Sequence, residues 1–257
     1  MFSLIIPTFN EEASVTETVR TAHETLTGAG EEFEILLIND GSTDGTAARL
    51  SEMQLPNLTV ITHPRNTGYS ASIKTGIRRA KGEVLGITDA DGTYPIGQFP
   101  HLLHVMREGN LDMVIGARVK KGVKIPLIRR PAKFIVNKLA NMLTGMRIPD
   151  LNSGMRIFTK EFALRFMHIY PQRFSFTITT TLAALTNDYL VEFVRLGAMF
   201  VSRRLKAHGE GLSVDERWRA LVRVQREFAV VLRQPERLES SGLVPDKCAD
   251  VLEAPGR

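Results

Sequence analysis

The chain has 257 residues, of which 43% are apolar, and this is enough to bury one core of ordinary size. The composition excludes a chain that is disordered throughout, and no stretch reaches the roughly 20 consecutive apolar residues of a membrane-spanning helix. The net charge of +5 is modest, and the basic segment from Arg118 to Lys138 has few interleaved aromatic residues, so we expect no nucleic-acid partner.

The cysteine content and the N-terminal residues indicate the cellular compartment in which the protein is expected. The single cysteine, Cys248, cannot form an internal disulfide and has no metal-ligand spacing around it, which favours a reducing compartment. The first apolar run is short and stands in the stretch MFSLIIPTFNEE, where no basic residue precedes it. This pattern favours a first β-strand over a signal peptide, and we expect a cytoplasmic protein.

In chain order, the first half alternates short apolar runs with helical patterns, which is typical of βαβ units and a parallel sheet. The predicted strands cover residues 2–9, 34–40, 58–63 and 83–91. The predicted helices cover residues 11–27, a stretch starting near Asp44, and residues 70–80. The sequence therefore predicts an α/β fold with a mainly parallel central sheet and flanking helices.

Polar residues end three of these strands: Asn10 and Glu11, Asn39 and Asp40, and Asp89 and Asp91. Taken alone, the Asp-x-Asp-Gly stretch is more often a turn than a metal site. Ligands of open α/β sheets, however, bind at the carboxyl ends of the strands, so we expect these acids to converge.

Converging carboxylates suit a divalent cation, Mg²⁺ or Mn²⁺, that binds a nucleoside diphosphate. The other common phosphate cradles are missing, because the chain has neither a G-x-x-x-x-G-K-[ST] loop nor a G-x-G-x-x-G after the first strand. Phosphate binding is therefore expected to depend on the cation and on basic side chains.

Five segments together resemble a known family: SLIIPTFNEE, INDGSTDGT, NTGYSASIKTG, DADGTYP and DLNSGMRIF. Their order and spacing are similar to those of the family 2 glycosyltransferases, which are inverting enzymes with the Rossmann-like GT-A fold. Within that family the chain looks most like the polyprenol-phosphate sugar synthases of the dolichyl-phosphate mannosyltransferase kind. The resemblance covers roughly residues 3–194.

The resemblance implies a role for particular positions. The residues that would border the nucleotide are Pro7, Phe9 and Glu11, with Asp40 on the base. The residues that would hold the metal and meet phosphate are Asp89, Asp91 and Arg118, with Asp91 the principal metal ligand. The segment from Asp150 to Gly154 matches the acceptor-side loop.

Four positions depart from the family pattern. Phe9 stands where tyrosine is usual, Asn39 where a first aspartate is common, Thr93 where glutamine often follows the acidic pair, and Arg195 where proline is usual. The Q-x-x-R-W motif of processive members is absent, which argues against a polymerising synthase.

The resemblance further implies metal-dependent transfer of a sugar from a nucleotide-diphospho-sugar, a UDP- or GDP-sugar, to a polyprenyl phosphate. A lipid phosphate is already an anion and needs no general base, whereas a sugar or protein hydroxyl acceptor needs one. Asp150 is the only acid of the acceptor-side motif, so it is either that base or a helix or turn cap. A non-catalytic nucleotide-sugar-binding protein on the same fold stays open, because fold does not fix function.

The remaining predictions concern the basic segments and the C-terminal part. A basic amphipathic helix from Pro131 could lie on the inner face of the cell membrane as a peripheral contact, or pack into a core. We expect a catalytic domain over residues 1–213 and an amphipathic helix with a mobile tail over 214–257. Arg203 and Arg204 are predicted in a solvated loop, or on a phosphate, and His63 is given no role because the histidines show no ligand spacing.

Overall fold

The computed structural model describes residues 1–118, 140–141, 144, 148–172, 175–196 and 202–205. By its contacts the chain divides into two compact units, one of Met1–Lys120 with Pro149–His208 and one of Lys121–Ile148 with Gly209–Arg257. All strands and helices named below belong to the first unit. The predicted division at residue 213 and the segment 214–257 lie outside the described residues. Of the amphipathic helix predicted from Pro131, only residues 140, 141 and 144 are described, and they are helical.

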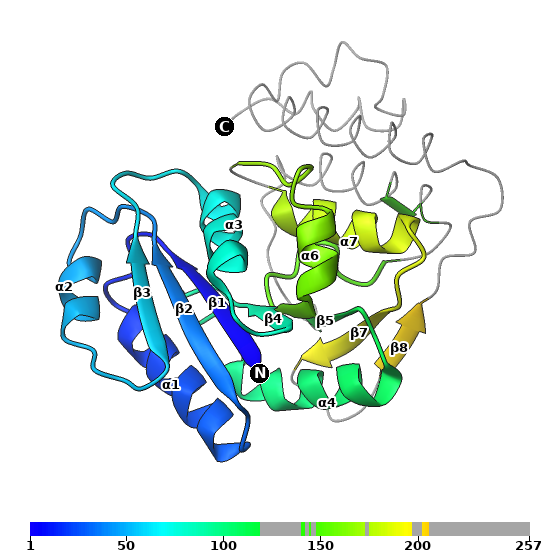
Figure 1. Cartoon of the computed structure of the whole chain (residues 1–257), viewed down its shortest axis with the longest axis horizontal. Coiled ribbons are helices and arrows are strands. Elements are labelled where there is room, and N and C mark those ends of the chain that lie inside the picture. The colour runs from blue at the N-terminus through cyan, green and yellow to red at the C-terminus, as the bar shows by residue number, and fades with distance from the viewer. Residues whose placement is uncertain (119–139, 142–143, 145–147, 173–174, 197–201, 206–257) are drawn as a thin grey trace, which may run out of the picture. The chain divides into compact units, whose positions relative to one another are not determined.

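The described strands form one eight-stranded sheet in the order β3-β2-β1-β4-β6-β5-β7-β8 (Figure 1). Their bounds are β1 Phe2–Thr8, β2 Phe33–Asn39, β3 Leu58–Thr62, β4 Val84–Ile87, β5 Met113–Arg118, β6 Arg156–Thr159, β7 Val191–Leu196 and β8 Ser202–Leu205. Strands β3, β2, β1 and β4 are parallel, as are β5 and β7, whereas β6 runs antiparallel to β4 and β5, and β8 antiparallel to β7. The predicted mainly parallel sheet is confirmed.

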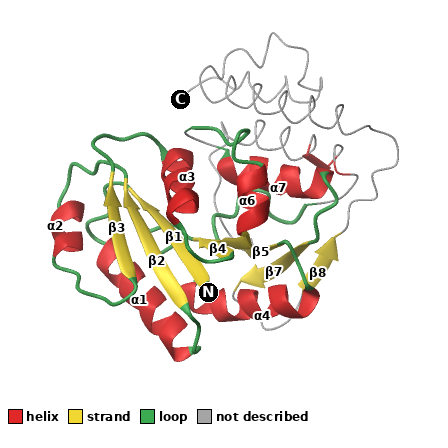
Figure 2. Cartoon of the chain, viewed as in Figure 1, coloured by secondary structure: helices red, strands yellow, loops and turns green. Residues whose placement is uncertain are grey.

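Helices flank the sheet, as Figure 2 shows. Their bounds are α1 Val15–Gly28, α2 Thr46–Ser51, α3 Tyr69–Arg79, α4 Phe99–Gly109, α6 Lys160–Arg165 and α7 Phe176–Thr186, with a short 3₁₀ helix at Ile96–Gln98. Both faces of β1 are covered, because Leu4 and Ile6 pack in one core with α1 and α4 while Ile5 meets α3 at Gly76. This explains the unbroken apolar run of β1, since a strand buried on both faces does not alternate. None of the described helices is long and apolar enough to cross a membrane.

Two boundaries differ from the prediction in a way that matters for the site. Helix α1 begins at Val15 rather than at Glu11, because the chain turns at Asn10, whose φ is 56°, and the Glu11 carbonyl accepts the amides of Ser14 and Val15. Strand β4 ends at Ile87, so Asp89 and Asp91 lie on the loop that follows it.

The prediction of a loop at Arg203 and Arg204 is wrong, because Ser202–Leu205 forms strand β8. It pairs antiparallel with β7, with Arg204 opposite Glu192. The neighbouring strand supplies the backbone partners, and the local sequence carries no signal of this pairing.

Candidate active site

A pocket of about 350 Å³ lies at the carboxyl ends of β1, β2 and β4. Its lining residues are Pro7, Thr8, Phe9, Glu11, Asp40, Asn66, Gly68, Tyr69, Ser72, Asp89, Ala90 and Asp91. Because these three strands are parallel neighbours, the residues that follow them reach the same edge of the sheet. The expected convergence of the strand-end acids is therefore confirmed.

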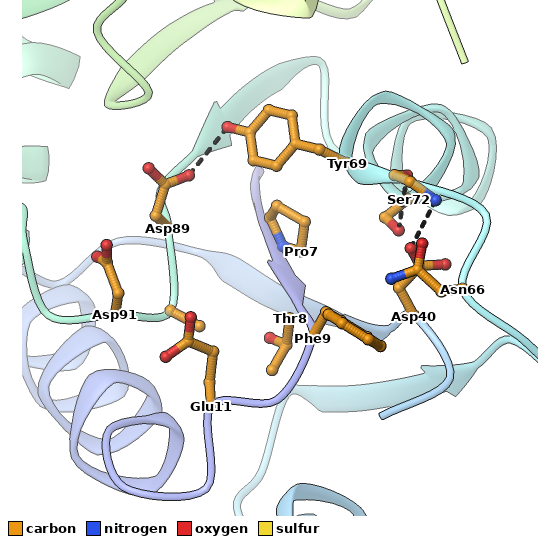
Figure 3. Close-up of a pocket in the computed structure, with 12 residues that line it drawn as sticks. Pro7, Thr8, Phe9, Glu11, Asp40, Asn66, Tyr69, Ser72, Asp89 and Asp91 are labelled. Atoms are coloured by element: carbon orange, nitrogen blue, oxygen red, sulfur yellow. Dashed lines mark hydrogen bonds between the residues drawn. The ribbon is translucent and has the colours of Figure 1, made fainter. Parts of the chain in front are cut away.

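The pocket has two chemically distinct ends. Figure 3 shows Asp40 on one side and the carboxylates of Asp89 and Asp91 on the other, with Pro7 and Phe9 between them. Asp40 is 3% exposed, whereas Asp91 is exposed and Phe9 keeps 41% of its surface open to solvent. A ligand that spans the pocket would meet one buried carboxylate at one end, an exposed aromatic ring in the middle and two carboxylates at the other end.

Asp40 is held by donors from the segment that follows β3. Its Oδ1 accepts the Thr67 amide at 2.9 Å, the Thr67 hydroxyl at 2.6 Å and His63 Nδ1 at 2.7 Å, while its Oδ2 accepts the Gly68 amide at 2.7 Å. Burial disfavours the charged form, but the hydrogen bonds of Thr67, His63 and Gly68 outweigh it and hold the pKa of Asp40 below its ordinary value. Asp40 is therefore a fixed anion at the floor of the pocket.

Asn39, which departs from the family pattern, shapes the loop beside Asp40. Its side chain is buried at 1% exposure, and its Oδ1 accepts the Ser42 amide at 3.1 Å. A carboxylate oxygen can accept the same bond, so asparagine preserves the turn without a second negative charge.

Asp89 is partly buried, and its carboxylate is held by a hydrogen bond and surrounded by charged neighbours. Tyr69, at the start of α3, donates its hydroxyl to Asp89 Oδ1 at 2.9 Å, as Figure 3 shows. Burial, and then the negative charge of Asp91, raise the pKa of Asp89, which the Tyr69 bond and the charge of Arg118 offset only in part. Burial and the charge of Asp89 also raise the pKa of Tyr69, so its hydroxyl keeps its proton and acts as the donor.

Asp91 is the exposed member of the pair. Its Oδ1 accepts the backbone amide of Thr93 at 2.9 Å, which orients the carboxylate in the turn around Gly92. Thr93, which stands where glutamine is frequent in the family pattern, contributes its backbone amide to this turn.

Asp89 and Asp91 fit a hydrated Mg²⁺ or Mn²⁺. Hard cations prefer carboxylate oxygens, and Mg²⁺ is usually held by one or two carboxylates together with substrate phosphates. Among the described residues, no group of three or more His, Cys, Asp or Glu side chains could hold a metal ion by itself. The pair is therefore suited to a cation that arrives with a phosphate ligand.

Arg118 and Asp150 form an ion pair outside the pocket lining. Arg118 Nε donates to Asp150 Oδ2 at 2.9 Å, and Arg118 also donates to the carbonyl of Asn152 at 3.3 Å. Asp150 is 4% exposed, and its burial opposes ionisation, but the bonds and charge of Arg118 prevail and lower its pKa. A carboxylate with a lowered pKa is a weak base, so the pair positions Arg118 more readily than it accepts a proton.

This ion pair is tied to Asp89 through Tyr94 and Gly154. The Arg118 guanidinium lies 5.7 Å from the centre of the Tyr94 ring, and the Gly154 amide donates to the Tyr94 hydroxyl at 2.6 Å. A Cβ on Gly154 would lie 2.8 Å from Asp89 Oδ2, so only glycine allows this close approach. The loop from Asp150 to Gly154 thus lies directly against Asp89.

Sequence reasoning missed several residues of the site, namely His63, Thr67, Tyr69, Ser72 and Tyr94. His63 had a detectable signal, because it follows β3 one residue after the pair Asn39 and Thr62, which puts it beside Asp40. The prediction that gave His63 no role did not anticipate its hydrogen bond to Asp40. Arg195, which stands where proline is usual in the family pattern, is exposed on β7 opposite Ala117.

Comparison with known proteins identifies relatives of the chain. Residues 3–170, well over half of it, match the model of a family described as Glycosyl transferase family 2. The low-salt glycan biosynthesis hexosyltransferase Agl6 of Haloferax volcanii is 30% identical over 166 residues. That match covers 62% of this chain and 38% of Agl6, so the chain spans less than half of the length of this relative.

Solved structures share the fold at low identity. Glucosyl-3-phosphoglycerate synthase from Mycobacterium tuberculosis, with phosphoglyceric acid, has a TM-score of 0.62 at 18% identity, covering 89% of this chain and 78% of that one. The same enzyme with Mn²⁺, UDP-Glc and glycerol 3-phosphate gives 0.62 at 17%, covering 90% and 79%. TarS of S. aureus with UDP-GlcNAc gives 0.58 at 19%, covering 89% and 65%. At these identities the likeness concerns the fold alone.

Proposed function

Because this chain belongs to glycosyl transferase family 2, we propose that it is a metal-dependent inverting glycosyltransferase that moves a sugar from a nucleotide-diphospho-sugar to a polyprenyl phosphate. The observation that carries the proposal is the two-ended pocket, with Asp40 at one end and Asp89 and Asp91 at the other. A nucleoside diphosphate has the same polarity, with a hydrogen-bonding base at one end and a diphosphate at the other.

On the donor side, Asp40 meets the base, while Pro7, Phe9 and Glu11 border the nucleotide. The exposed ring of Phe9 offers an apolar face on which a base can stack. Asp89 and Asp91 would hold Mg²⁺ or Mn²⁺, with Asp91 as the principal ligand because it is exposed and its Oδ2 accepts no hydrogen bond from the described residues. A bound cation would neutralise the charge that develops on the diphosphate leaving group.

Arg118 is the protein's own cation for the leaving group. It stays charged, because the hydrogen bonds of Asp150 raise its pKa. Arg118 lies beside Tyr94, and its positive charge acts to lower the pKa of Asp89. Both observations indicate that Arg118 is near the proposed metal end of the pocket. A fixed guanidinium aimed at developing phosphate charge lowers the barrier without further reorganisation.

The state of Asp150 favours an acceptor that is already ionised. A hydroxyl acceptor needs a base, and the only acid of the acceptor-side motif is bound to Arg118 with a lowered pKa. A phosphate acceptor needs no proton removed before it attacks the anomeric carbon. We therefore assign Asp150 to positioning Arg118, with the hydroxyl-acceptor reaction as the alternative.

Peripheral contact with the inner face of the cell membrane belongs to the same proposal, since a polyprenyl phosphate resides in a bilayer. Its support is the basic composition of the chain between Arg118 and Lys138, which suits anionic lipid headgroups.

The test is a transfer assay with radiolabelled UDP-glucose, UDP-GlcNAc and GDP-mannose, with and without Mn²⁺, using undecaprenyl phosphate in detergent as acceptor. We expect label in the lipid phase only when Mn²⁺ is present. Label that appears only as free sugar would support a hydroxyl acceptor instead. If no donor is consumed under any condition, the protein binds nucleotide sugars without catalysing transfer.

A further inference from the structure

The hydrogen-bonding capacity of Asp40 is divided unequally between its two oxygens. Oδ1 accepts three donors within 2.9 Å, two from Thr67 and one from His63, and is saturated. Among the residues that the structure describes, Oδ2 accepts only the Gly68 amide, at 2.7 Å. A carboxylate oxygen has two lone pairs, so one acceptor position remains on Oδ2 of a residue that lines the pocket.

His63 reinforces this division, because it is a third donor to Oδ1 and is itself held from both sides. Its Nδ1 lies 2.7 Å from Asp40 Oδ1 and its Nε2 lies 3.0 Å from the hydroxyl of Thr75. Asp40 accepts only, which assigns the ring proton to Nδ1, and Thr75 then donates to Nε2. The three residues come from the ends of β2 and β3 and from α3, so the orientation of Asp40 is locked by three elements.

We propose that His63 is a positioning residue that presents a single oxygen of Asp40 to the donor base, so that the site selects uracil over guanine. This inference rests on the proposed function, because it takes the pocket to be the donor site. It goes further by naming the nucleotide and the residue that determines the choice.

The chemistry of the two bases supports the choice. The edge of guanine offers two adjacent donors, N1–H and the exocyclic amine, which pair best with both oxygens of a carboxylate. Oδ1 of Asp40 already accepts its full number of hydrogen bonds, so one of the two guanine donors would be left without a partner. An unpaired buried polar group lowers the binding affinity. Uracil offers one ring N–H between two carbonyls, and this matches one free acceptor.

The pocket also offers a donor for a base carbonyl. Asn66 lines the pocket beside Asp40, and its amide can donate to an oxygen next to the ring N–H (Figure 3). A guanine in the same place has an amine on one side of its ring N–H and a carbonyl on the other. Only the carbonyl could accept a hydrogen bond from the Asn66 amide. Cytosine has an unprotonated ring nitrogen at the position of the uracil N–H, and this nitrogen would face the carboxylate unfavourably.

The experiment measures the dissociation constants of UDP, GDP and CDP in the presence of Mn²⁺ by titration calorimetry on the full chain. We expect UDP to bind at least tenfold more tightly than GDP or CDP. GDP binding as tightly as UDP would overturn the inference and leave the proposed function intact. Failure of all three nucleotides to bind would instead overturn the proposed function.

Variants test the part assigned to His63. His63→Leu removes both hydrogen bonds, and we expect the preference for UDP over GDP to fall about tenfold, with the donor KM raised and kcat little changed. His63→Asn, whose amide nitrogen can replace Nδ1–H, should restore most of the preference. The exposed His104 on α4 supplies the control His104→Leu. A preference unchanged in folded His63→Leu, or no recovery in His63→Asn, would contradict the role.

Discussion

At the scale of single residues, Asp89 joins the parts of the site. It accepts the hydroxyl of Tyr69, lies against Gly154 of the loop that begins at Asp150, and lines the same end of the pocket as Asp91. A carboxylate with this many neighbours has a defined orientation before any ligand binds, and such preorganisation strengthens binding of a charged ligand.

Removal of the Tyr69 hydroxyl tests this preorganisation. In Tyr69→Phe, Asp89 loses its side-chain donor, and we expect kcat/KM to fall about tenfold, as is usual when a group that orients a metal ligand is lost. Steady-state kinetics would measure it. The control is Tyr170→Phe, because the buried hydroxyl of Tyr170 has no hydrogen-bond partner in the described part of the chain. Equal activity of the two variants would mean that Tyr69 does not orient Asp89.

Gly154 makes a second prediction at this scale. The added Cβ of Gly154→Ala would lie 2.8 Å from Asp89 Oδ2 and must displace that carboxylate. We expect kcat to fall by about a hundredfold, because a misplacement of about 1 Å in a catalytic group costs this much. Gly97→Ala is the matched control, since a Cβ there meets nothing within 4 Å. Wild-type kcat in a folded Gly154→Ala protein would show that the contact is not needed.

The residues that sequence could predict are those marked by strand ends. Glu11, Asp40, Asp89 and Asp91 each lie at or just after the end of a predicted parallel strand, and the topology brings these strand ends together. Tyr69 and Tyr94 were not predicted, because their partners Asp89 and Gly154 lie 20 and 60 positions away in the chain. No local pattern encodes contacts of that range.

At the scale of elements, an ion pair links α4 to the end of α1. Arg107 donates to both oxygens of Glu31, at 2.7 and 2.6 Å. The side chain of Arg107 is 58% exposed, so the pair is screened by solvent and is expected to contribute no more than about 1 kcal/mol. Its bidentate geometry adds directional specificity to the contact between α4 and the turn that follows α1.

The pH dependence of this pair can be predicted. The hydrogen bond of Arg107 lowers the pKa of Glu31 below its ordinary value of 4.5. A lowered folded-state pKa adds stability that is present above pH 4.5 and is lost as the pH falls through the folded pKa. Arg107→Met should therefore lower the free energy of unfolding by about 0.5 to 1 kcal/mol at pH 7.

Urea denaturation of both proteins at pH 7 and near pH 3 would measure the difference. We expect the wild-type advantage to shrink toward pH 3, where Glu31 becomes protonated. An advantage of the same size at both pH values would point to the aliphatic stem of Arg107 as its source.

Elements of the first half were predicted more completely than those of the second. Strands β1 to β3 match their predictions within one residue at each end. The apolar runs of β1 and β2 are buried on both faces and stand out from polar loops, whereas β3, a partly exposed edge strand, is marked by its β-branched residues. Strands β5 to β8 were not predicted. Of these, β6 and β8 are four residues long and run antiparallel to their neighbours, so the alternation of strand and helix that marks the first half does not extend to them.

At the scale of the whole molecule, the structural neighbours confirm the predicted GT-A type of fold at less than 20% identity. Such a fold supports many transferases, so the choice of donor and acceptor depends on the side chains around the pocket. In this member of glycosyl transferase family 2, Asp40, held by His63, lies at one end of the pocket and Asp89 and Asp91 lie at the other, with the Arg118–Asp150 pair outside the lining.

The measurement that tests this account most directly is donor turnover by Asp91→Asn in the presence of Mn²⁺. The substitution keeps the shape of the turn, because the asparagine oxygen can still accept the Thr93 amide, but it removes the charge that the cation requires. Asp188→Asn is the matched control, since Asp188 is exposed outside the pocket and has a φ of 61°, which asparagine tolerates.

We predict that Asp91→Asn lowers turnover by roughly a hundredfold or more, while Asp188→Asn keeps the wild-type rate. An unchanged rate in Asp91→Asn would contradict the assignment of this end of the pocket as the metal and diphosphate site.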